Sequence, residues 1–295
     1  MACANTRLAK KVALFKRIGF IDPDSHRIRT RRAITLQDLE SAYALVCEVF
    51  LEKGYINPMQ GGVRLRSFEA VPEMATFVAE IDGRIVGVMS IVPDSPGLGL
   101  PSDKAFHDDL GRLRAAGRKV AEVTNLAILK DYRNSGVFMS LAQPIVAHAM
   151  SAGYDDIFIA ISPGHAGFFE EVLQFEPWGD ARDYSHEKAD TVEGKRWDLH
   201  ALEGLLIAAD RQLGDAAFLH KHFFSQNVCH QYVRPWSTIA ARAFMDQAGL
   251  RKLFVERSGF IGRCTPEELD AIHNQWGDAL FGEVCSGETM DLAIV

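Results

Sequence analysis

The sequence lacks any segment that predicts a membrane span or a cleaved signal peptide. No run reaches the roughly eighteen uninterrupted apolar residues of a spanning helix, and Lys16 and Arg17 break the only apolar stretch near the start of the chain. These absences predict a cytoplasmic location. Peripheral membrane contact stays open as an alternative, because residues 1–20 place basic side chains among apolar ones at helical spacing.

Cysteine is scarce, and metal-binding patterns are missing. The chain has five cysteines, an odd number, with no Cys-x-x-Cys pair and no grouping with histidine at metal-ligand spacing. We therefore expect free thiols in a reducing compartment and no metal site. Internal repeats and low-complexity stretches are missing as well, so the sequence predicts an ordinary globular fold over most of its 295 residues, a length of about two domains.

Basic charge is low overall and unevenly distributed. The chain has 32 Lys and Arg against 39 Asp and Glu, a net charge of −7, which argues against nucleic-acid binding. Residues 1–34 nevertheless hold nine Lys or Arg and two Asp, a net of +7, whereas residues 265–295 hold seven acidic residues and no Lys or Arg. The basic start suits an acidic partner, an anionic membrane surface or the acidic end of the same chain.

Hydrophobic periodicity predicts a mixed α/β order of elements. Strands are expected at 29–35, 74–81, 84–92, 120–129 and 156–161, and helices at 8–19, 104–119, 137–150 and 163–173 as well as directly after Thr35. Further helices are expected at 199–224, at 238–254 and after a capping box at Thr265. We predict a basic N-terminal arm at 1–26, an α/β core at 27–190 and a mostly helical C-terminal extension at 191–295.

The stretch from residue 120 to residue 137 carries the strongest chemical signal. A strand leads into the turn Arg133-Asn134-Ser135-Gly136, and a helix follows. Such a turn directs backbone N–H groups and a helix N-terminus toward one point, and Arg133 adds a positive charge. The pattern predicts a phosphate or pyrophosphate site, with an ordinary strand-to-helix turn as the alternative.

This turn resembles the phosphopantetheine-binding turn of the GNAT acyltransferase superfamily. Phe138 stands where Gly or Ala is usual, which favours a donor with a single phosphate, such as acyl carrier protein, over the pyrophosphate of CoA. The preceding segment, 122–128, is similar to a strand of acyl-homoserine-lactone autoinducer synthases, with Asn125 replacing their Arg. A closer resemblance is to long-chain N-acyl amino acid synthases, from about Arg29 to Tyr184, including the stretches 49–55 and 163–169.

The resemblance implies an α/β fold with a GNAT-like mixed central sheet flanked by helices. It implies an enzyme without a permanently bound cofactor that transfers a long-chain fatty acyl group from a phosphopantetheine thioester to the amine of an amino acid. The donor is expected to be acyl carrier protein, with acyl-CoA as the other option. The residues expected to bind it are Leu126, Ala127, Ile128, Arg133, Asn134, Ser135, Gly136 and Val137.

The chemistry of acyl transfer suggests roles for residues of the same strand. An amino acid amine is mostly protonated at pH 7, so a base must remove a proton, and Glu122 is the candidate, directly or through a water. Its alternative role is to pair with an Arg or to orient the strand. Backbone N–H groups around Asn125 and Leu126 are the expected donors to the oxyanion.

The remaining candidates would contact the substrates or the carrier protein. Thr124, Asn125 and His165 are expected near the acceptor, and Phe138, Phe168 and Phe169 along the acyl chain, with helix capping by His165 and plain core packing of the rings as alternatives. Carrier proteins are acidic, so the clusters Arg27, Arg29, Arg31, Arg32 and Arg112, Arg114, Arg118, Lys119 are candidates to steer docking, with a solvated face as the alternative for the second cluster.

Two other functions fit the same sequence. One is a CoA-dependent N-acetyltransferase of a small amine, which shares the donor turn. The other is a non-catalytic regulator that binds acyl carrier protein or lipid, which Phe138 and a Phe169 in the place of a common Tyr would favour.

Overall fold

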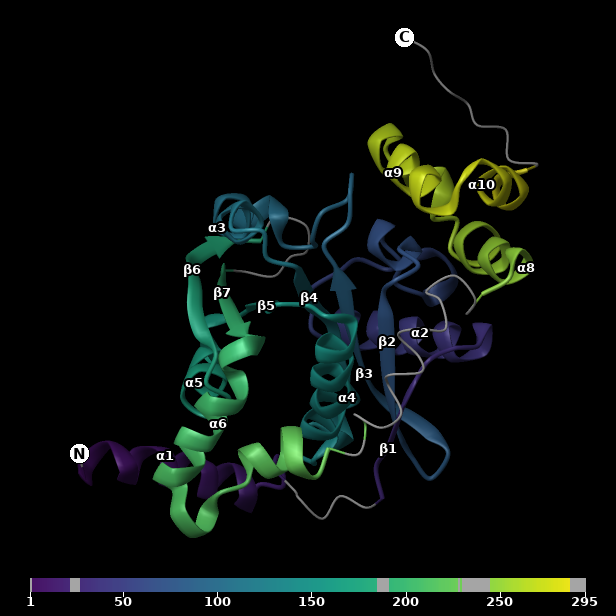
Figure 1. Ribbon diagram of the computed structural model, residues 1–295. Helices are drawn as coiled ribbons and strands as arrows, with labels where there is room; N and C mark the ends of the chain where they lie inside the picture. Colours follow the sequence, from purple (N-terminus) through teal and green to yellow (C-terminus); the bar gives the residue numbers. More distant parts are fainter. Residues whose placement is uncertain (1, 22–26, 185–190, 228, 230–244, 287–295) are drawn as a thin grey trace.

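The computed structural model describes residues 2–21, 27–184, 191–227, 229 and 245–286 (Figure 1). Seven strands form one sheet in the order β1-β2-β3-β4-β5-β7-β6. The strands are β1 (Arg29–Arg32), β2 (Ala75–Ile81), β3 (Arg84–Pro93), β4 (Val120–Ile128), β5 (Asp156–Ile161), β6 (Glu176–Asp183) and β7 (Thr191–Asp198). β4 and β5 pair in parallel, and the other neighbours pair antiparallel. The predicted mixed sheet of an α/β fold is confirmed.

The hairpin between β2 and β3 forms where its turn sequence predicts it. Asp82 and Gly83 connect the two strands with φ angles of 51° and 78°. A tight two-residue hairpin turn of this type needs positive φ at both central positions, and Asp-Gly is among the pairs that adopt it most readily. This hairpin fixes the register of the strands that precede β4.

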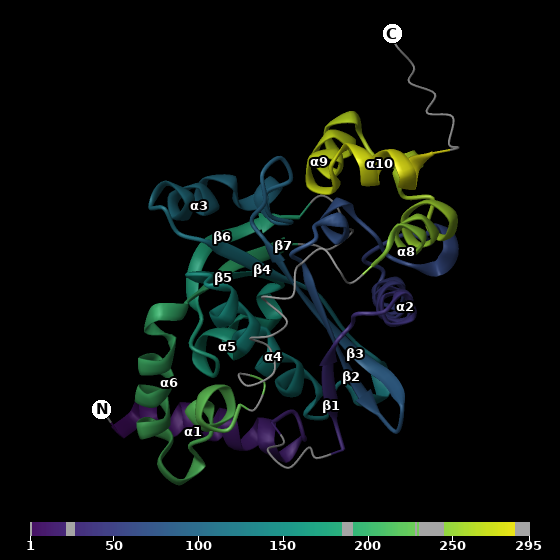
Figure 2. The ribbon, with the colours of Figure 1, turned by 45° about the vertical axis from the view of Figure 1, so that its right-hand side comes forward.

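Helices cover both faces of the sheet. They are α1 (Ala2–Arg17), α2 (Leu36–Glu52), α3 (Asp103–Ala115), α4 (Val137–Ala152), α5 (Pro163–Glu171), α6 (Leu199–Leu213), α8 (Gln247–Leu250), α9 (Pro266–Trp276) and α10 (Asp278–Cys285). α2 and α4 lie on opposite sides of β2 and β3 (Figure 2). Thr76 of β2 contacts Tyr43 of α2, whereas the next residue, Phe77, packs its ring against His148 of α4. Successive side chains of β2 therefore point to opposite faces of the sheet, one toward α2 and the next toward α4.

α4 lies close to the sheet because β3 has a glycine where the two elements meet. A Cβ atom on Gly87 would lie 2.6 Å from Cγ1 of Val137, the first residue of α4. That contact is too short for any side chain. The close approach sets where the N-terminus of α4 stands relative to the end of β4.

The predicted N-terminal helix packs on the domain. Leu8 and Val12 of α1 are buried, Lys11 pairs with Glu171 of α5 at 2.6 Å, and α1 contacts α6 (Figure 1). The apolar face of this basic helix is thus covered by other parts of the same chain. This packing agrees with the arm as a structural element, and membrane contact through residues 1–20 stays a prediction.

The sheet extends beyond the boundary that the sequence predicts at residue 190. β7 lies between β5 and β6 and contributes Thr191–Asp198 to the core, so the helical part begins only with α6. The periodicity after residue 190 hides this strand because Gly194, Lys195 and Arg196 interrupt its apolar pattern. Residues 238–244 of the helix expected at 238–254 lie outside the described residues.

The described residues of the extension after β7 are mostly helical, as predicted. α8 continues into a π-helical segment, Arg251–Arg257, and α9 begins with the expected capping box. The Thr265 hydroxyl accepts from the backbone N–H of Glu268 at 3.3 Å, and the Glu268 carboxylate accepts from the N–H of Thr265 at 3.1 Å. The cap orients the first turn of α9 toward residues 67–70 of the core.

Two properties of the described part of the chain concern location and metal binding. No helix among these residues combines the length and apolarity needed to cross a membrane. The same residues contain no group of three or more His, Cys, Asp or Glu arranged to hold a metal ion.

Candidate active site

The central strand β4 separates from β5 after a short paired stretch. The two strands pair only from Val120 to Glu122, opposite Asp156 to Phe158. On its other edge β4 stays paired with β3 as far as Ile128. The second half of β4 therefore has an edge that no neighbouring strand of the described sheet occupies.

A bulge lies in this open half of β4. Val88 of β3 faces Ala127, yet Ser90 faces Thr124, so one residue too many lies on the β4 side. Asn125 adopts a left-handed conformation with φ of 52°, and the side chain of Leu126 is 39 % exposed. A bulge leaves an extra residue out of the ladder and redirects its backbone. The predicted oxyanion donors thus stand at an irregular point of the strand, where Asn125 is buried and Leu126 is exposed.

Glu122 is buried at the last position where β4 pairs with β5. Its side-chain oxygens accept hydrogen bonds from the backbone N–H of Ser102 at 2.9 Å and from the Ser102 hydroxyl at 2.7 Å. Burial raises the pKa of Glu122 to about 7, against the opposing effects of the Ser102 hydrogen bonds and of Arg66. A carboxyl group with a pKa near neutrality can take up and release a proton at physiological pH.

The side chain of Asn125 is fixed by charged residues from another segment. Arg64 donates to its oxygen at 2.9 Å, and its own amide nitrogen donates to Glu69 at 2.9 Å. Arg66 pairs with the same Glu69 oxygen at 3.0 Å and also reaches the Thr124 hydroxyl at 3.4 Å. This cluster holds the strained backbone of the bulge in one conformation.

The charges of this cluster influence one another. Burial lowers the pKa of Arg64 to about 9, and the neighbouring Arg66 adds to the effect. Burial alone would raise the pKa of Glu69, yet Arg66 and Arg64 outweigh it and hold that pKa below its ordinary value. Glu69 is therefore ionised at neutral pH and compensates part of the positive charge.

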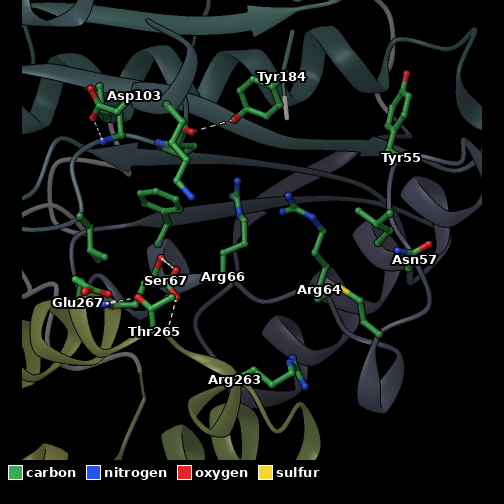
Figure 3. Close-up of a pocket in the computed structure, with 18 of the residues that line it drawn as sticks. Tyr55, Asn57, Arg64, Arg66, Ser67, Asp103, Tyr184, Arg263, Thr265 and Glu267 are labelled. Atoms are coloured by element: carbon green, nitrogen blue, oxygen red, sulfur yellow. Dashed lines mark hydrogen bonds between the residues drawn. The ribbon is translucent and has the colours of Figure 1, made fainter. Parts of the chain in front are cut away.

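A cavity of about 910 Å³ opens beside the cluster (Figure 3). It is lined by residues 55–60, by Arg64, Arg66, Ser67 and Phe68, by residues 97–104 apart from 99 and 102, by Tyr184, and by Arg263, Thr265, Glu267 and Glu268. The side chains of Arg64 and Arg66 point into it from one side (Figure 3). The Tyr184 hydroxyl, on the far side, donates to the backbone oxygen of Pro101 at 3.1 Å.

Glu122 lies behind the wall of this cavity rather than in it. Ser102, which holds its carboxylate, sits between two lining residues, Pro101 and Asp103, and is itself fully buried. A proton from a molecule in the cavity would therefore reach Glu122 through the Ser102 hydroxyl or a water. The sequence leaves open whether a proton passes to Glu122 directly or through a water. This conformation fits transfer through a bridging group and not direct contact.

The sequence analysis missed Arg64, Arg66 and Tyr184. One signal was present: Arg64 and Arg66 alternate with Val63 and Leu65, both buried apolar residues, which places two charges on one side of an extended segment. Tyr184 carries no such signal, because only the return of the chain after β6 brings it to the cavity.

The predicted donor turn connects the open half of β4 to α4. The Arg133 side chain donates to the backbone oxygen of Ile128 at 3.2 Å and pairs with Glu52 at 2.6 Å. Ser135 donates to the oxygen of Tyr132 at 2.6 Å. α4 starts at Val137, and its N-cap residue, Gly136, has no side chain that could cap it. These features leave the first N–H groups of α4 for an anion.

The N-terminal arm lies against the donor turn. Gly19 has φ of 77°, and a Cβ atom there would lie 2.8 Å from the backbone oxygen of Asn134. The next residue, Phe20, stacks on Phe138 with ring centroids 5.3 Å apart and an interplanar angle of 17°. Phe138 is 5 % exposed, so its ring packs into the protein instead of covering the turn.

The predicted substrate residues divide into two groups. The Thr124 hydroxyl contacts Arg66, which lines the cavity, whereas Phe168 and Phe169 of α5 pack edge-on against Phe138, at 5.7 and 5.9 Å between ring centroids. His165 lies at the start of α5, where its ring nitrogen contacts the Ser162 hydroxyl at 2.8 Å. Partial burial and the nearby Lys53 lower the pKa of His165.

Most arginines of the two candidate docking clusters are engaged within the chain. The ion pairs are Arg27–Asp82, Arg31–Asp38, Arg31–Glu80, Arg112–Asp109, Arg114–Asp94, Arg114–Asp103, Arg118–Asp156 and Arg118–Asp198. Arg32 is buried and donates to the backbone oxygen of Met74 at 3.4 Å. These side chains fasten strands and helices to one another, which weakens the expectation that they steer a partner.

Known proteins resemble this chain in sequence pattern and in fold. The family model of the N-acyl amino acid synthase FeeM matches residues 41–193, which is more than half of the chain. The structure of FeeM, an N-acyl amino acid synthase from uncultured soil microbes, is similar with a TM-score of 0.53 and 22 % identity, over 60 % of this chain and 94 % of that one. No curated protein matches this chain by sequence.

Two further solved structures share less of the geometry. The CoA-dependent acyl-homoserine lactone synthase BjaI, with SAM and isopentyl-CoA, has a TM-score of 0.43 and 15 % identity, over 62 % of this chain and 89 % of that one. An acetyltransferase of the GNAT family from Streptococcus pneumoniae has a TM-score of 0.41 and 17 % identity, over 58 % and 98 % of the two chains.

Proposed function

Because the chain belongs to the N-acyl amino acid synthase FeeM family and is therefore an acyltransferase, we propose that it acylates the amine of an amino acid with a long-chain fatty acyl group. The donor is a phosphopantetheine thioester, carried on acyl carrier protein. The observation that carries this proposal is the position of Glu122, a buried carboxyl with a pKa of about 7, beside the bulge of β4 and next to a cavity.

Glu122 acts as the base for the acceptor amine. The Ser102 hydroxyl already donates to Glu122 at 2.7 Å, so it can take a proton from the amine as its own proton passes to the carboxylate. Loss of that proton leaves the nitrogen lone pair free to attack the thioester carbonyl carbon. General base catalysis of this kind contributes roughly 10²- to 10⁴-fold to turnover.

The bulge of β4 supports the second half of the reaction. As the C–N bond forms, the carbonyl oxygen becomes an oxyanion, and the backbone N–H groups at Asn125 and Leu126 donate to it. Collapse of the tetrahedral intermediate breaks the C–S bond, and the nitrogen loses its second proton, which the departing thiolate takes up as the amide forms. The thiol of phosphopantetheine, with an ordinary pKa near 8.5, leaves as a thiolate and needs little acid assistance.

The donor lies along the open edge of β4. The amide groups of phosphopantetheine can pair with Leu126, Ala127 and Ile128 in the manner of an added strand. Its phosphate then reaches the turn 133–137, where Arg133 and the N-terminus of α4 favour an anion. The acyl chain extends toward the rings of Phe138, Phe168 and Phe169.

The experiment offers three donors to the purified protein in parallel. Long-chain acyl-acyl carrier protein, the matching long-chain acyl-CoA and acetyl-CoA are each incubated with a mixture of the twenty amino acids, and the products are identified by mass spectrometry. We expect N-acyl amino acids from the carrier-protein donor. Acetylated amines from acetyl-CoA alone would overturn the long-chain assignment, and no acylated amine from any donor would overturn the acceptor class.

A further inference from the structure

Two arginine side chains line one wall of the cavity beside β4. Arg64 is 4 % exposed, and Arg66 lies next to it on the same side of the extended segment. Glu69 pairs with Arg66 at 3.0 Å. Glu122 also acts on Arg66, yet it carries no charge once it holds a proton. Proton uptake by Glu122 therefore removes one negative charge near Arg66, and a bound anion would replace it.

Arg66 has an unused donor at this wall. Its terminal nitrogen reaches Glu69, Thr124 and Asn125, whereas its Nε atom is buried and has no hydrogen-bond partner among the residues that the structure describes. A buried N–H without a partner is costly, and a guanidinium group presents its donors in the geometry of a carboxylate. The arrangement suits a carboxylate ligand.

A neighbouring wall of the cavity comes from the C-terminal extension. The Ser67 hydroxyl donates to Glu268 at 3.1 Å, and the indole nitrogen of Trp276 donates to the backbone oxygen of Ala70 at 2.8 Å. Both contacts fasten α9 to the short segment that follows Arg66. The matched family model ends at residue 193, so this wall lies outside the part of the chain that the family shares.

We propose that Arg66, together with Arg64, binds the carboxylate of the acceptor in this cavity, and that the first turn of α9 forms the outer wall against which the rest of the acceptor lies. The proposal rests on the function proposed above and names the site of its acceptor. Arg66 lies 3.4 Å from the Thr124 hydroxyl, so a carboxylate on Arg66 is close to β4. The attacking amine must be close to β4 as well, which selects α-amino acids over amines that carry no carboxylate or carry it far from the nitrogen.

The test compares each accepted amino acid with its primary amide, which has the same side chain and no negative charge. For the wild-type protein we expect kcat/KM to be roughly 10- to 100-fold higher for the acid, the worth of a charge-assisted hydrogen bond. Arg66→Gln combined with Glu69→Gln leaves the net charge of the cluster unchanged and should bring this ratio close to one, mainly through KM. Arg66→Lys should keep part of the preference.

A matched control lies in the same cavity. Arg263 lines it from the extension, where it donates to the backbone oxygen of Ser258 at 2.6 Å. Arg263→Gln should leave the acid-to-amide ratio within about threefold of wild type. An unchanged ratio in the Arg66 double variant, or a ratio lost in Arg263→Gln, would overturn the carboxylate assignment. Melting temperatures of all variants show whether each protein is folded.

The outer wall has its own test. Glu267 lines the cavity at the first turn of α9, whereas Glu283 is exposed on α10. Glu267→Ala should change the order in which the twenty amino acids are accepted, and Glu283→Ala should not. If Glu267→Ala accepts the amino acids in the same order as the wild type, α9 does not take part in selecting the acceptor.

The two proposals fail in different ways. A wild-type protein that makes no N-acyl amino acid disproves the proposed function. In that case calorimetric binding of the amino acid mixture, without donor, decides the carboxylate site: binding that the Arg66 double variant loses supports it, and absence of binding overturns it.

Discussion

Ser102 holds both oxygens of the Glu122 carboxylate, with its backbone N–H at 2.9 Å and its hydroxyl at 2.7 Å. Each bond favours the ionised carboxylate and lowers the pKa of Glu122, whereas burial raises it more strongly, to about 7. The loop before α3 therefore influences the pH at which Glu122 ionises.

Glu122→Gln should lower kcat at least about 100-fold, because the amide cannot take up the proton of the amine. The steady-state rate with saturating donor and acceptor measures the effect, and donor binding should be unchanged. Glu193→Gln, a partly exposed position on β7, is the matched control. Wild-type turnover in Glu122→Gln would remove Glu122 from the mechanism.

Ser102→Ala should shift the acidic limb of the kcat–pH profile to higher pH. The variant loses the hydroxyl that lowers the pKa of Glu122, so the carboxylate forms only above its present value of about 7. The rate at pH values well above the limb should fall too, since the proton relay is lost. A limb at an unchanged pH would show that another group limits the reaction.

The same carboxyl should make folding stability depend on pH. The pKa of Glu122 rises from 4.5 to about 7 in the folded protein, so the folded state binds the proton more tightly. This contribution to the free energy of unfolding is fully present below pH 4.5 and is lost as the pH rises through 7, by up to ~3 kcal/mol. Urea unfolding at several pH values should show this loss in the wild type, and Glu122→Gln should lack it. If the free energy of unfolding depends on pH in the same way in both proteins, the raised pKa does not belong to Glu122.

Binding of the acceptor should itself raise the pKa of Glu122. A carboxylate on Arg66 neutralises a positive charge that lowers this pKa, so Glu122 becomes the stronger base when the acceptor is present. The acidic limb of kcat, which reports the loaded enzyme, should then lie at higher pH than the pKa of Glu122 in the free protein. NMR titration of the free protein gives the pKa of Glu122 without the acceptor. If this pKa equals that of the acidic limb of kcat, the acceptor carboxylate does not bind Arg66.

Asn125 should prefer glycine over alanine as its replacement. The residue has φ of 52°, which costs an L-residue with a Cβ atom roughly 1 kcal/mol and costs glycine little. Both variants lose the bonds to Arg64 and Glu69, so the difference between them isolates the backbone term. The free energy of unfolding of Asn125→Ala should therefore lie below that of Asn125→Gly. The reverse order would mean that the bulge relaxes.

Phe138→Ala should destabilise the protein by roughly 3 kcal/mol, because the ring is buried among Phe20, Phe168 and Phe169. Phe168→Ala, at a half-buried position, should cost less. If the acyl chain also uses this cluster, both variants shift the chain-length distribution of the product, which mass spectrometry resolves. Loss of stability without such a shift would assign the rings to packing alone.

The elements around the central strand could be predicted from the sequence because their signals are local. The turn Asp82-Gly83, the capping box at Thr265 and the apolar run of β5 each depend on residues that are neighbours in the chain. β6 and β7 carry weak patterns, since Gly179, Gly194 and Lys195 interrupt them, and their pairing is formed by distant parts of the chain. The predicted boundary at residue 190 fails for that reason.

The candidate site was predictable only along β4. Glu122 and Asn125 lie in a motif that spacing and resemblance reveal together. Arg64 and Arg66 come from an irregular segment that pairs with β4 side chains 58 to 61 positions away, and no local pattern indicates that contact. The arginine clusters near residue 30 and residue 115 show a different limit, because a count of arginines does not reveal the acids that the fold places beside them.

The contact between Ser67 and Glu268 joins residues 201 positions apart. During synthesis β4, the strand that carries Glu122 and Asn125, leaves the ribosome well before α9, and chains tend to fold from the N-terminal side as they emerge. A nascent chain can thus complete β4 while one wall of the cavity is still missing. Selection of the acceptor would then be the last property that the growing protein acquires.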